Sequence, residues 1–295
     1  MRFPFWDVFL VSHISKGSFM GHFSKALEKM ESDNGSSNGD ETLPEGELCS
    51  KTEGSTPENP FSKDTRRKHL VVLSDPWSYS SEQFRSIKTS IMFPEDGREL
   101  RTILVTSAVP GEGKSFVASN IAAAIASSMD NYVLVIDSDL RRPTISDIFD
   151  LPAQAPGLDL YLNNKCPLRD VIYRTHVEKL SVIPAGNIVE NPSELITSST
   201  MTHMLSDVRS RYSDRYVIID SPPPLFAPET IAVSKHVDGI VLVVRNDKTL
   251  KKSVAEMLDK MDRSKVIGIV LNRYDSPIGK DHGYRGYYSY GKKRR

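Results

Sequence analysis

The stretch from Arg101 to Ile121 constrains the chain more than any other. An apolar run is followed by a glycine turn and then by a helical pattern, in the order RTILVTSAVPGEGKSFVASNI. The spacing of a phosphate-binding loop, with alanine in place of its first glycine, is met by Ala108, Gly111, Gly113, Lys114 and Ser115. A strand before and a helix after are the context in which this loop binds phosphate. The segment therefore predicts a nucleotide site where a strand ends.

Each residue type in the loop has a physical reason to be there. Gly111 and Gly113 let the backbone turn its N–H groups toward phosphate oxygens, because no Cβ stands in the way. Lys114 opens a helix whose positive end favours anions, and its ammonium is a point charge for the β- and γ-phosphates. The Ser115 hydroxyl is the usual inner ligand of Mg²⁺. The residues expected at the nucleotide are Pro110, Gly111, Glu112, Gly113, Lys114, Ser115, Phe116 and Asn272.

From His69 onward, short β-branched apolar runs alternate with helical patterns. Nearly continuous apolar runs are typical of strands that are buried on both faces. The strand candidates are 101–106, 132–136, 180–184, 216–220, 239–245 and 266–271; the helix candidates are 114–129, 167–174, 192–211, 229–235 and 250–261. The alternation predicts a doubly wound, mainly parallel α/β sheet that binds its ligands at the carboxyl ends of the strands.

The two ends of the chain are expected to lie outside this domain of residues 69–275. Residues 1–30 are predicted to form an N-terminal extension with a short helix at Phe23–Met30. For the first 20 residues three interpretations stay open: a poorly ordered segment, an upstream-start extension or an interfacial anchor. The polar composition of residues 31–68 predicts a flexible linker. Residues 276–295 form a tyrosine-rich tail. No apolar run reaches the roughly 18–20 residues of a membrane helix, so we expect no membrane span.

Carboxylates close two of the strand candidates. VLVIDSDLRRP places Asp137 and Asp139 on one side of an extended chain, with Arg141 close behind, and YVIIDSPPPL ends its apolar run at Asp220. A lone aspartate at a strand end is often a helix cap, but after a phosphate-binding loop we expect Asp220 to bind Mg²⁺ through water. Of two paired acids, one can position the metal while the other accepts a proton from an attacking hydroxyl. Arg141 can stabilise charge or hold Asp139.

Taken together, these motifs resemble the bacterial tyrosine kinases, or BY-kinases, that accompany capsular and exopolysaccharide export. ILVTSAVPGEGKS at 103–115 is similar to the family's Walker A, VIDSDLR at 135–141 to its Walker A′ and IIDSPP at 218–223 to its Walker B. VIPAGNIVENPSELI at 182–196 and IGIVLNRYD at 267–275 extend the likeness, which runs from about Leu70 to the C-terminus.

The resemblance implies a P-loop NTPase fold of the MinD/ParA kind and an ATP- and Mg²⁺-dependent protein-tyrosine autokinase. It implies a cytoplasmic enzyme that regulates polysaccharide assembly. The predicted catalytic residues are Lys114 as phosphate clamp, Asp137 as base and Arg141, and the predicted metal set is Ser115, Asp139 and Asp220. Asp137 and Asp139 are close enough in sequence to exchange roles.

The family also implies partners. Its E-x-x-R-x-x-R helix, through which subunits form a ring, is matched here by Glu82 and Arg85, with Lys88 in place of the last arginine. Because lysine lacks the bidentate fork of arginine, we expect the same oligomer contact in a weaker form. The predicted phosphorylation cluster is Tyr284, Tyr287, Tyr288 and Tyr290. Further implied partners are a membrane protein of the chain-length-determinant type, which recruits the chain to the inner face of the membrane, and a protein-tyrosine phosphatase.

Other functional classes fit less well. A MinD/ParA-type positioning ATPase carries a signature lysine five residues before the loop lysine, and that position is Val109. A non-catalytic nucleotide-binding adaptor would not need Lys114, Asp137 and Asp220 together. The basic Gly-Tyr tail can also stack on single-stranded nucleic acid, but Lys plus Arg equals Asp plus Glu at 38 each. We therefore expect no nucleic-acid partner.

Overall fold

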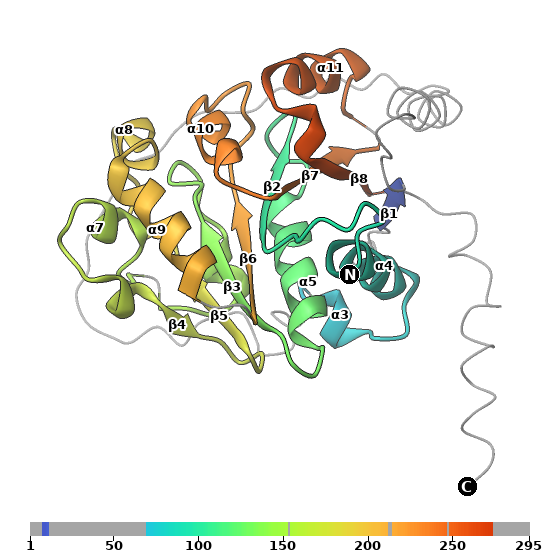
Figure 1. The fold of residues 1–295 in the computed structure, drawn as a ribbon, viewed down its shortest axis with the longest axis horizontal. Coiled ribbons are helices and arrows are strands. Elements are labelled where there is room, and N and C mark those ends of the chain that lie inside the picture. Colours follow the sequence, from blue (N-terminus) through green and yellow to red (C-terminus); the bar gives the residue numbers. More distant parts are fainter. Residues whose placement is uncertain (1–7, 12–68, 153, 212–213, 247, 274–295) are drawn as a thin grey trace, which may run out of the picture.

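The computed structural model describes residues 8–11, 69–152, 154–211, 214–246 and 248–273 (Figure 1). Within them one eight-stranded sheet has the order β1-β8-β7-β2-β6-β3-β5-β4. The strands are β1 (Val8–Val11), β2 (Thr102–Ser107), β3 (Tyr132–Asp137), β4 (Tyr173–Arg174), β5 (Leu180–Ile183), β6 (Arg215–Asp220), β7 (Gly239–Arg245) and β8 (Val266–Asn272). The α-helices are α3 (Val71–Ser74), α4 (Tyr79–Met92), α5 (Lys114–Ala126), α6 (Ile145–Ile148), α7 (Leu158–Leu162), α8 (Pro192–Ile196), α9 (Ser199–Arg211), α10 (Glu229–Lys235) and α11 (Lys251–Lys260), with 3₁₀ turns η1 (Leu168–Val171) and η2 (Arg263–Lys265).

The six inner strands of this sheet are parallel. Strands β8, β7, β2, β6, β3 and β5 pair parallel to their neighbours, while β1 and β4 pair antiparallel at the two edges. β2 lies between β6 and β7, so the chain leaves it in one direction along the sheet and later returns on its other side. Crevices at such reversals are where open α/β sheets bind ligands. The predicted mainly parallel sheet is confirmed.

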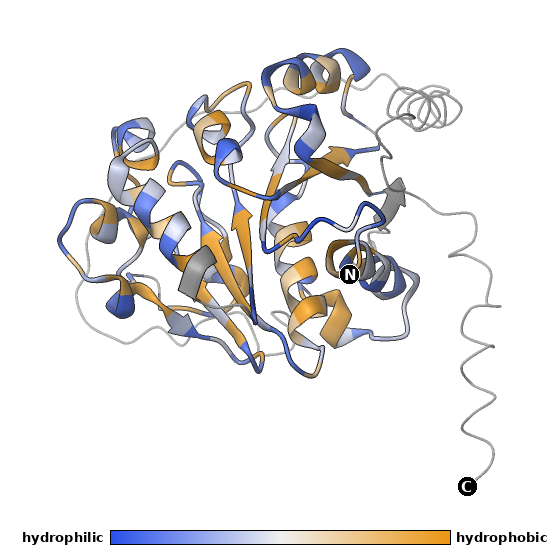
Figure 2. Ribbon diagram, in the orientation of Figure 1, coloured by the Kyte–Doolittle hydropathy of each residue, from blue (hydrophilic) through white to orange (hydrophobic). Residues whose placement is uncertain are grey.

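Helices cover both faces of the sheet, and the alternation of side chains along β2 shows why. Ile103 and Val105 belong to one hydrophobic core with helices α3 to α6, whereas Leu104 belongs to a second core with helices α7 to α11. Side chains of successive strand residues point to opposite faces, so an unbroken apolar strand needs a helical layer on each side. Figure 2 shows the apolar residues concentrated along the inner strands and on helix surfaces. The doubly wound prediction is confirmed.

Two of the predicted helices are wrong. Residues 167–174 form the short turn η1 and then β4, in which Tyr173 pairs with Val182. Residues 192–211 form two helices instead of one. The first ends where the Thr197 hydroxyl donates to the Ser193 carbonyl, and the second begins where the Ser198 hydroxyl accepts the Met201 N–H. Side chains that bond to nearby backbone compete with helix continuation.

Strand β1 lies in the segment that the sequence assigned to an N-terminal extension. Val8–Val11 pairs antiparallel with residues 269–272 of β8, which gives the edge of β8 a backbone partner. An unpaired strand edge exposes a row of N–H and C=O groups, and β1 satisfies them over four residues of β8. The predicted helix at Phe23–Met30, the linker 31–68 and the tail 276–295 lie outside the described residues.

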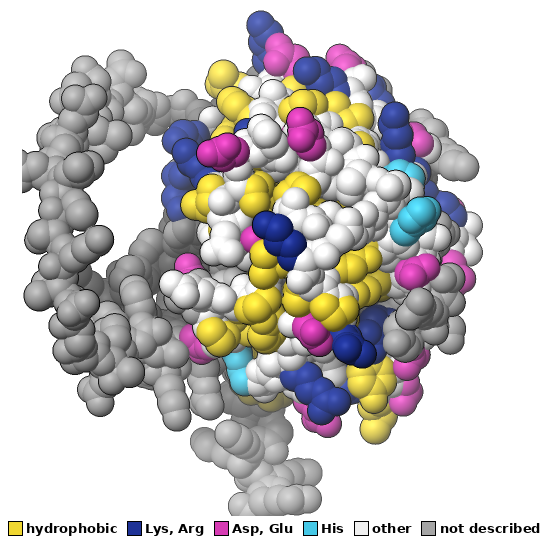
Figure 3. Space-filling model, turned by 90° about the vertical axis from the view of Figure 1, so that its left-hand side faces the viewer, with side chains coloured by type: hydrophobic (Ala, Val, Ile, Leu, Met, Phe, Trp, Pro, Cys, Tyr) yellow, Lys and Arg dark blue, Asp and Glu magenta, His cyan; other side chains and the backbone are white. Residues whose placement is uncertain are grey.

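The surface of the described part mixes charge types. Figure 3 shows the side of the molecule that carries α7, α8 and α9, where basic and acidic side chains are interspersed among hydrophobic ones. Among the described residues, no helix combines the length and apolar character needed to cross a membrane.

Candidate active site

The glycine loop joins β2 to α5 in a conformation that only glycine adopts easily. Gly111 has φ of 82° and Gly113 has φ of 89°, both in the left-handed region. Gly113 is also the N-cap of α5, so the amides of the first helical turn face the loop. A Cβ at Gly113 would lie 2.1 Å from the Asn272 side-chain nitrogen. The loop is therefore closed by contact with the end of β8.

The structure brings together the loop lysine, the loop serine and the predicted acids. Lys114 Nζ lies 3.7 Å from Asp139 Oδ2, with both side chains about one-tenth exposed. The Ser115 hydroxyl donates to Asp220 Oδ2. These residues come from the start of α5, from the end of β6 and from the turn after β3, so the site forms at the carboxyl edge of the parallel strands.

Asp137 and Asp220 lie side by side on neighbouring strands. They are register partners at the ends of β3 and β6, and both are fully buried. Burial raises the pKa of Asp220 to about 6, against the lowering effect of Lys114 and of the Ser115 hydrogen bond. Burial and the Asp220 charge raise the pKa of Asp137 well above its usual range, although backbone N–H groups oppose this. Carboxyl groups with raised pKa values are common where catalysis needs a base near neutral pH.

Backbone donors hold the Asp137 carboxylate in place. Its Oδ1 accepts the Asp139 N–H at 3.1 Å, and its Oδ2 accepts the N–H groups of Thr144 and Ile145, each at 3.2 Å. Ile145 begins α6, so Asp137 caps that helix from the preceding strand. The residue thus has a structural role, whatever its part in the chemistry.

Arg141 has a partner that the sequence did not predict. Its Nε and Nη2 donate to Glu229 Oε1 at 3.1 and 3.0 Å, and the Glu229 side chain is almost fully buried while that of Arg141 is nearly half exposed. Of the two roles expected for Arg141, holding Asp139 is not the one that the structure shows, because Glu229 on α10 holds the guanidinium. Asp139 instead accepts the Arg142 N–H at 3.1 Å. No local motif links Glu229 to the VIDSDLR segment, since 88 residues separate it from Arg141.

The donor set fits a nucleotide-bound Mg²⁺. Asp220 Oδ1 is buried and has no hydrogen-bond partner among the described residues. A buried oxygen of this kind is costly unless a cation or water satisfies it. No cluster of three or more His, Cys, Asp or Glu side chains is placed to enclose a metal in the described ranges. Mg²⁺ usually keeps several waters and binds through one or two carboxylates together with phosphate oxygens, so the Asp220 and Asp139 carboxylates beside the Ser115 hydroxyl suit it.

Three residues expected at the nucleotide direct their side chains elsewhere. Glu112 is 1 % exposed and its carboxylate accepts the Val109 N–H at 2.9 Å. Asn272 donates to the Glu112 carbonyl at 2.7 Å. Phe116 packs edge-to-face on Phe84 of α4, with ring centroids 6.0 Å apart. Their backbone groups remain part of the loop and its surroundings, while Pro110 and Gly111 form its exposed turn.

The predicted oligomer helix is present as α4. Phe84, Ile87 and Ile91 are buried against the sheet. Arg85 donates to Glu82 on the same helix and to the Pro76 carbonyl, and Lys88 is part-exposed on that side. The contact between subunits stays a prediction, and the four tail tyrosines lie outside the described residues.

Comparisons with known proteins agree with this geometry. The ParA model, described as NUBPL iron-transfer P-loop NTPase, matches residues 100–284. The chain is 32 % identical over 222 residues to tyrosine-protein kinase YwqD of Bacillus subtilis, covering 75 % of this chain and 92 % of that protein. It is 36 % identical over 225 residues to putative tyrosine-protein kinase CapB of Staphylococcus aureus, covering 76 % and 95 %.

Two solved structures are similar in fold and sequence. The chimerical protein CapA2B2 superposes with a TM-score of 0.65 at 36 % identity, covering 70 % of this chain and 91 % of that one. The kinase domain of Escherichia coli tyrosine kinase ETK gives 0.63 at 31 % identity, covering 68 % and 78 %.

Proposed function

The chain belongs to the bacterial tyrosine kinases, and from that premise we propose that this protein-tyrosine kinase uses ATP and Mg²⁺ to phosphorylate its own C-terminal tyrosines in trans. We propose further that the reaction regulates the assembly and export of capsular or exopolysaccharide. The observation that carries the proposal is the convergence of Lys114, Ser115, Asp139 and Asp220 at one edge of the sheet. The tyrosines that would be modified are Tyr284, Tyr287, Tyr288 and Tyr290.

In this proposal the residues of the site divide the work. When bound, Mg–ATP would supply the phosphoryl group, and the metal would neutralise charge on the phosphates. The loop amides and Lys114 hold the phosphates, and Ser115, Asp139 and Asp220 hold the metal. Asp137 accepts the proton of the attacking tyrosine hydroxyl, a role helped by its raised pKa.

In the proposal, Arg141 stabilises charge on the transferred phosphoryl group. Glu229 fixes its guanidinium through two hydrogen bonds to one oxygen, while nearly half of the side chain stays exposed. An arginine that is already oriented loses less freedom when an anion arrives.

The proposed assembly follows from the family. A membrane protein of the chain-length-determinant type would recruit the chain to the inner face of the membrane, and the α4 side with Glu82, Arg85 and Lys88 would join subunits into a ring. A protein-tyrosine phosphatase would remove the phosphates from the tail. Val109 stands where a positioning ATPase has its signature lysine, which disfavours that alternative and with it any nucleic-acid partner.

Mixing two complementary chains tests the reaction. One chain carries Lys114→Met and keeps its tail; the other is active but has phenylalanine at all four tail tyrosines. Anti-phosphotyrosine blotting should label the Lys114→Met chain only in the mixture, because the active site comes from the other subunit. ATP hydrolysis is measured in parallel. An unlabelled tail in the presence of oligomers and steady hydrolysis would show that trans phosphorylation is wrong.

A further inference from the structure

Glu112 presents a physical conflict. It lies in the middle of a loop that binds anionic phosphates, yet it carries a carboxylate, and its side chain is 1 % exposed. A buried charge beside an anion site is unfavourable unless other groups take up its hydrogen bonds. Here the carboxylate is satisfied by donors of the protein itself, which accounts for its burial in the loop.

The donors come from separate parts of the chain. Oε2 accepts the Val109 N–H at 2.9 Å, and Oε1 accepts the Arg245 N–H at 3.2 Å and the Thr249 hydroxyl. The Arg245 N–H is shared with the Thr249 hydroxyl oxygen, at 3.1 Å. Val109 belongs to the entry of the loop, while Arg245 ends β7 and Thr249 precedes α11. One side chain thus ties the loop to the carboxyl end of a neighbouring strand.

The backbone of the same residue is tied on its other side. Asn272 at the end of β8 donates its side-chain N–H to the Glu112 carbonyl at 2.7 Å. The flanking residues are Gly111 and Gly113, which permit the left-handed conformation but do not enforce it. Glu112 is therefore the residue between the two glycines whose side chain can fix the direction of the loop amides.

From these contacts we propose that Glu112 is a positioning residue that holds the loop in its phosphate-binding conformation before the nucleotide arrives. It does not touch the nucleotide with its side chain. Ordering two glycines costs conformational entropy. A loop that is already ordered in the free protein binds more tightly, because this entropy is not lost when the nucleotide binds. Thr249 takes part in the same positioning, since its hydroxyl donates to Glu112 Oε1.

The test measures Mg–ADP affinity by calorimetry, so it needs no phosphotransfer and is independent of which tyrosines are modified. Glu112→Ala should weaken binding about tenfold or more, because the loop loses the hydrogen bonds that tie it to Val109, Arg245 and Thr249. Thr249→Val should weaken it by a smaller factor, and Thr249→Ser, which keeps the hydroxyl, should restore it. Glu178→Ala, an exposed glutamate before β5, is the matched control.

Hydrogen exchange separates positioning from mere folding. In Glu112→Ala the amides of Val109 and Arg245 should lose protection, while kcat at saturating ATP falls less than kcat/KM. Where Glu112→Ala fails to fold, Glu112→Gln, which keeps the shape but turns one acceptor into a donor, replaces it. If the folded variant, Glu112→Ala or its replacement Glu112→Gln, binds Mg–ADP within about twofold of the wild type, the proposal is overturned, whatever the stability of that variant. Equal losses in Thr249→Ser and Thr249→Val overturn the part assigned to the hydroxyl.

Discussion

At the carboxyl edge of the sheet Asp220 is fully buried with one oxygen unpaired among the described residues, whereas at the amino edge Asp238 has its hydrogen bonds in place. Asp238 Oδ2 accepts the Arg101 N–H at 3.1 Å, the Thr102 N–H at 2.9 Å and the Thr102 hydroxyl at 2.7 Å. The same type of side chain thus joins two strands at one edge and keeps one oxygen without a partner among the described residues at the other.

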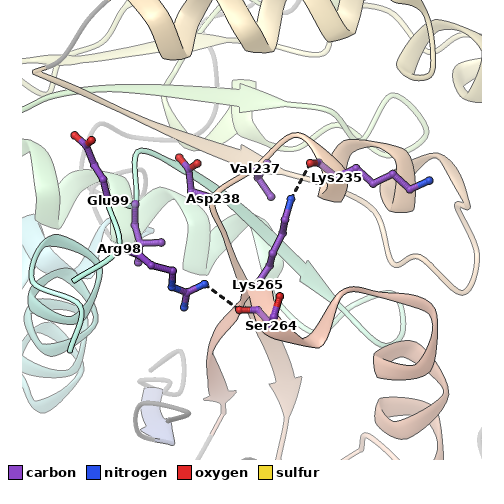
Figure 4. Close-up of a pocket in the computed structure, with 8 residues that line it drawn as sticks. Arg98, Glu99, Lys235, Val237, Asp238, Ser264 and Lys265 are labelled. Carbon is purple, nitrogen blue, oxygen red and sulfur yellow. Dashed lines mark hydrogen bonds between the residues drawn. The ribbon is translucent and has the colours of Figure 1, made fainter. Parts of the chain in front are cut away.

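Two cations at the amino edge are also bonded to protein groups. Figure 4 shows the groove there, in which Lys265 reaches the Lys235 carbonyl at 2.7 Å and Arg98 reaches the Ser264 carbonyl at 2.9 Å. Lys265 therefore caps the end of α10, where carbonyls lack partners in the helix. The comparison teaches that charge alone does not distinguish the candidate active site from the amino edge. The site is distinguished by two buried acids with raised pKa values, one of which, Asp220, has an oxygen without a partner among the described residues.

The comparison is tested most strongly by two substitutions at the carboxyl edge. Asp137→Asn should lower kcat about a hundredfold or more while Mg–ADP affinity changes only a few-fold, because a base acts in the transition state. Asp220→Asn should instead remove most of the Mg²⁺ dependence of nucleotide binding. Single-turnover phosphorylation and calorimetry at varied Mg²⁺ measure both. Equal losses of nucleotide binding in the two variants would make Asp137 a metal-site residue and leave the base unassigned.

An intermediate effect is expected at the amino edge. Asp238→Ala removes an acceptor of at least three hydrogen bonds and should lower the free energy of unfolding by about 2–3 kcal/mol. Nucleotide affinity should not change, since this edge lies at the opposite ends of the strands. Urea unfolding and calorimetry give the two values, with Glu99→Ala, one partner of an exposed ion pair, as control. A tenfold loss of Mg–ADP affinity in Asp238→Ala would mean that the two edges are not independent.

The smallest predicted effect is an increase in the free energy of unfolding, not a decrease. The pKa of Asp220 is raised from 3.8 to about 6, so the nucleotide-free protein binds a proton there more tightly when folded. This stabilisation is complete below the unfolded pKa and is lost as pH rises from about 4 through 6, because ionising a buried carboxyl then opposes folding. Asp220→Asn should raise the free energy of unfolding at pH 7 by about 1–2 kcal/mol, after the loss of the Ser115 hydrogen bond, and flatten its pH dependence between 4 and 6.

Urea unfolding of the nucleotide-free protein across this pH range measures the effect. A less stable Asp220→Asn variant at pH 7 would mean that the ionised carboxylate is well compensated in the fold, and the contrast with Asp238 would then disappear.

The sequence by itself determined the loop, the inner strands and the identity of the acids. Strand, glycine turn, lysine and helix are consecutive in residues 101–121, and continuous apolar runs identify strands buried on both faces, so local pattern is sufficient. Asp137 and Asp220 could be predicted because each ends its strand, and Asp139 because it lies two residues beyond Asp137. Lys114 and Ser115 could be predicted because they follow the glycine turn directly and begin the helix.

Only the tertiary structure decided which groups meet across the sheet. Glu112 is hydrogen-bonded to Arg245, Thr249 and Asn272, at sequence separations of 133, 137 and 160 residues. Arg141 is hydrogen-bonded to Glu229, 88 residues away. The strand order, the register that places Asp137 beside Asp220 and the pairing of β1 with β8 are of the same kind. Side-chain period and helix propensity report on neighbours within a few residues, so they carry no signal for these contacts. Packing of the parallel strands brings these distant segments together, and with them the surroundings that raise the pKa values of the acids.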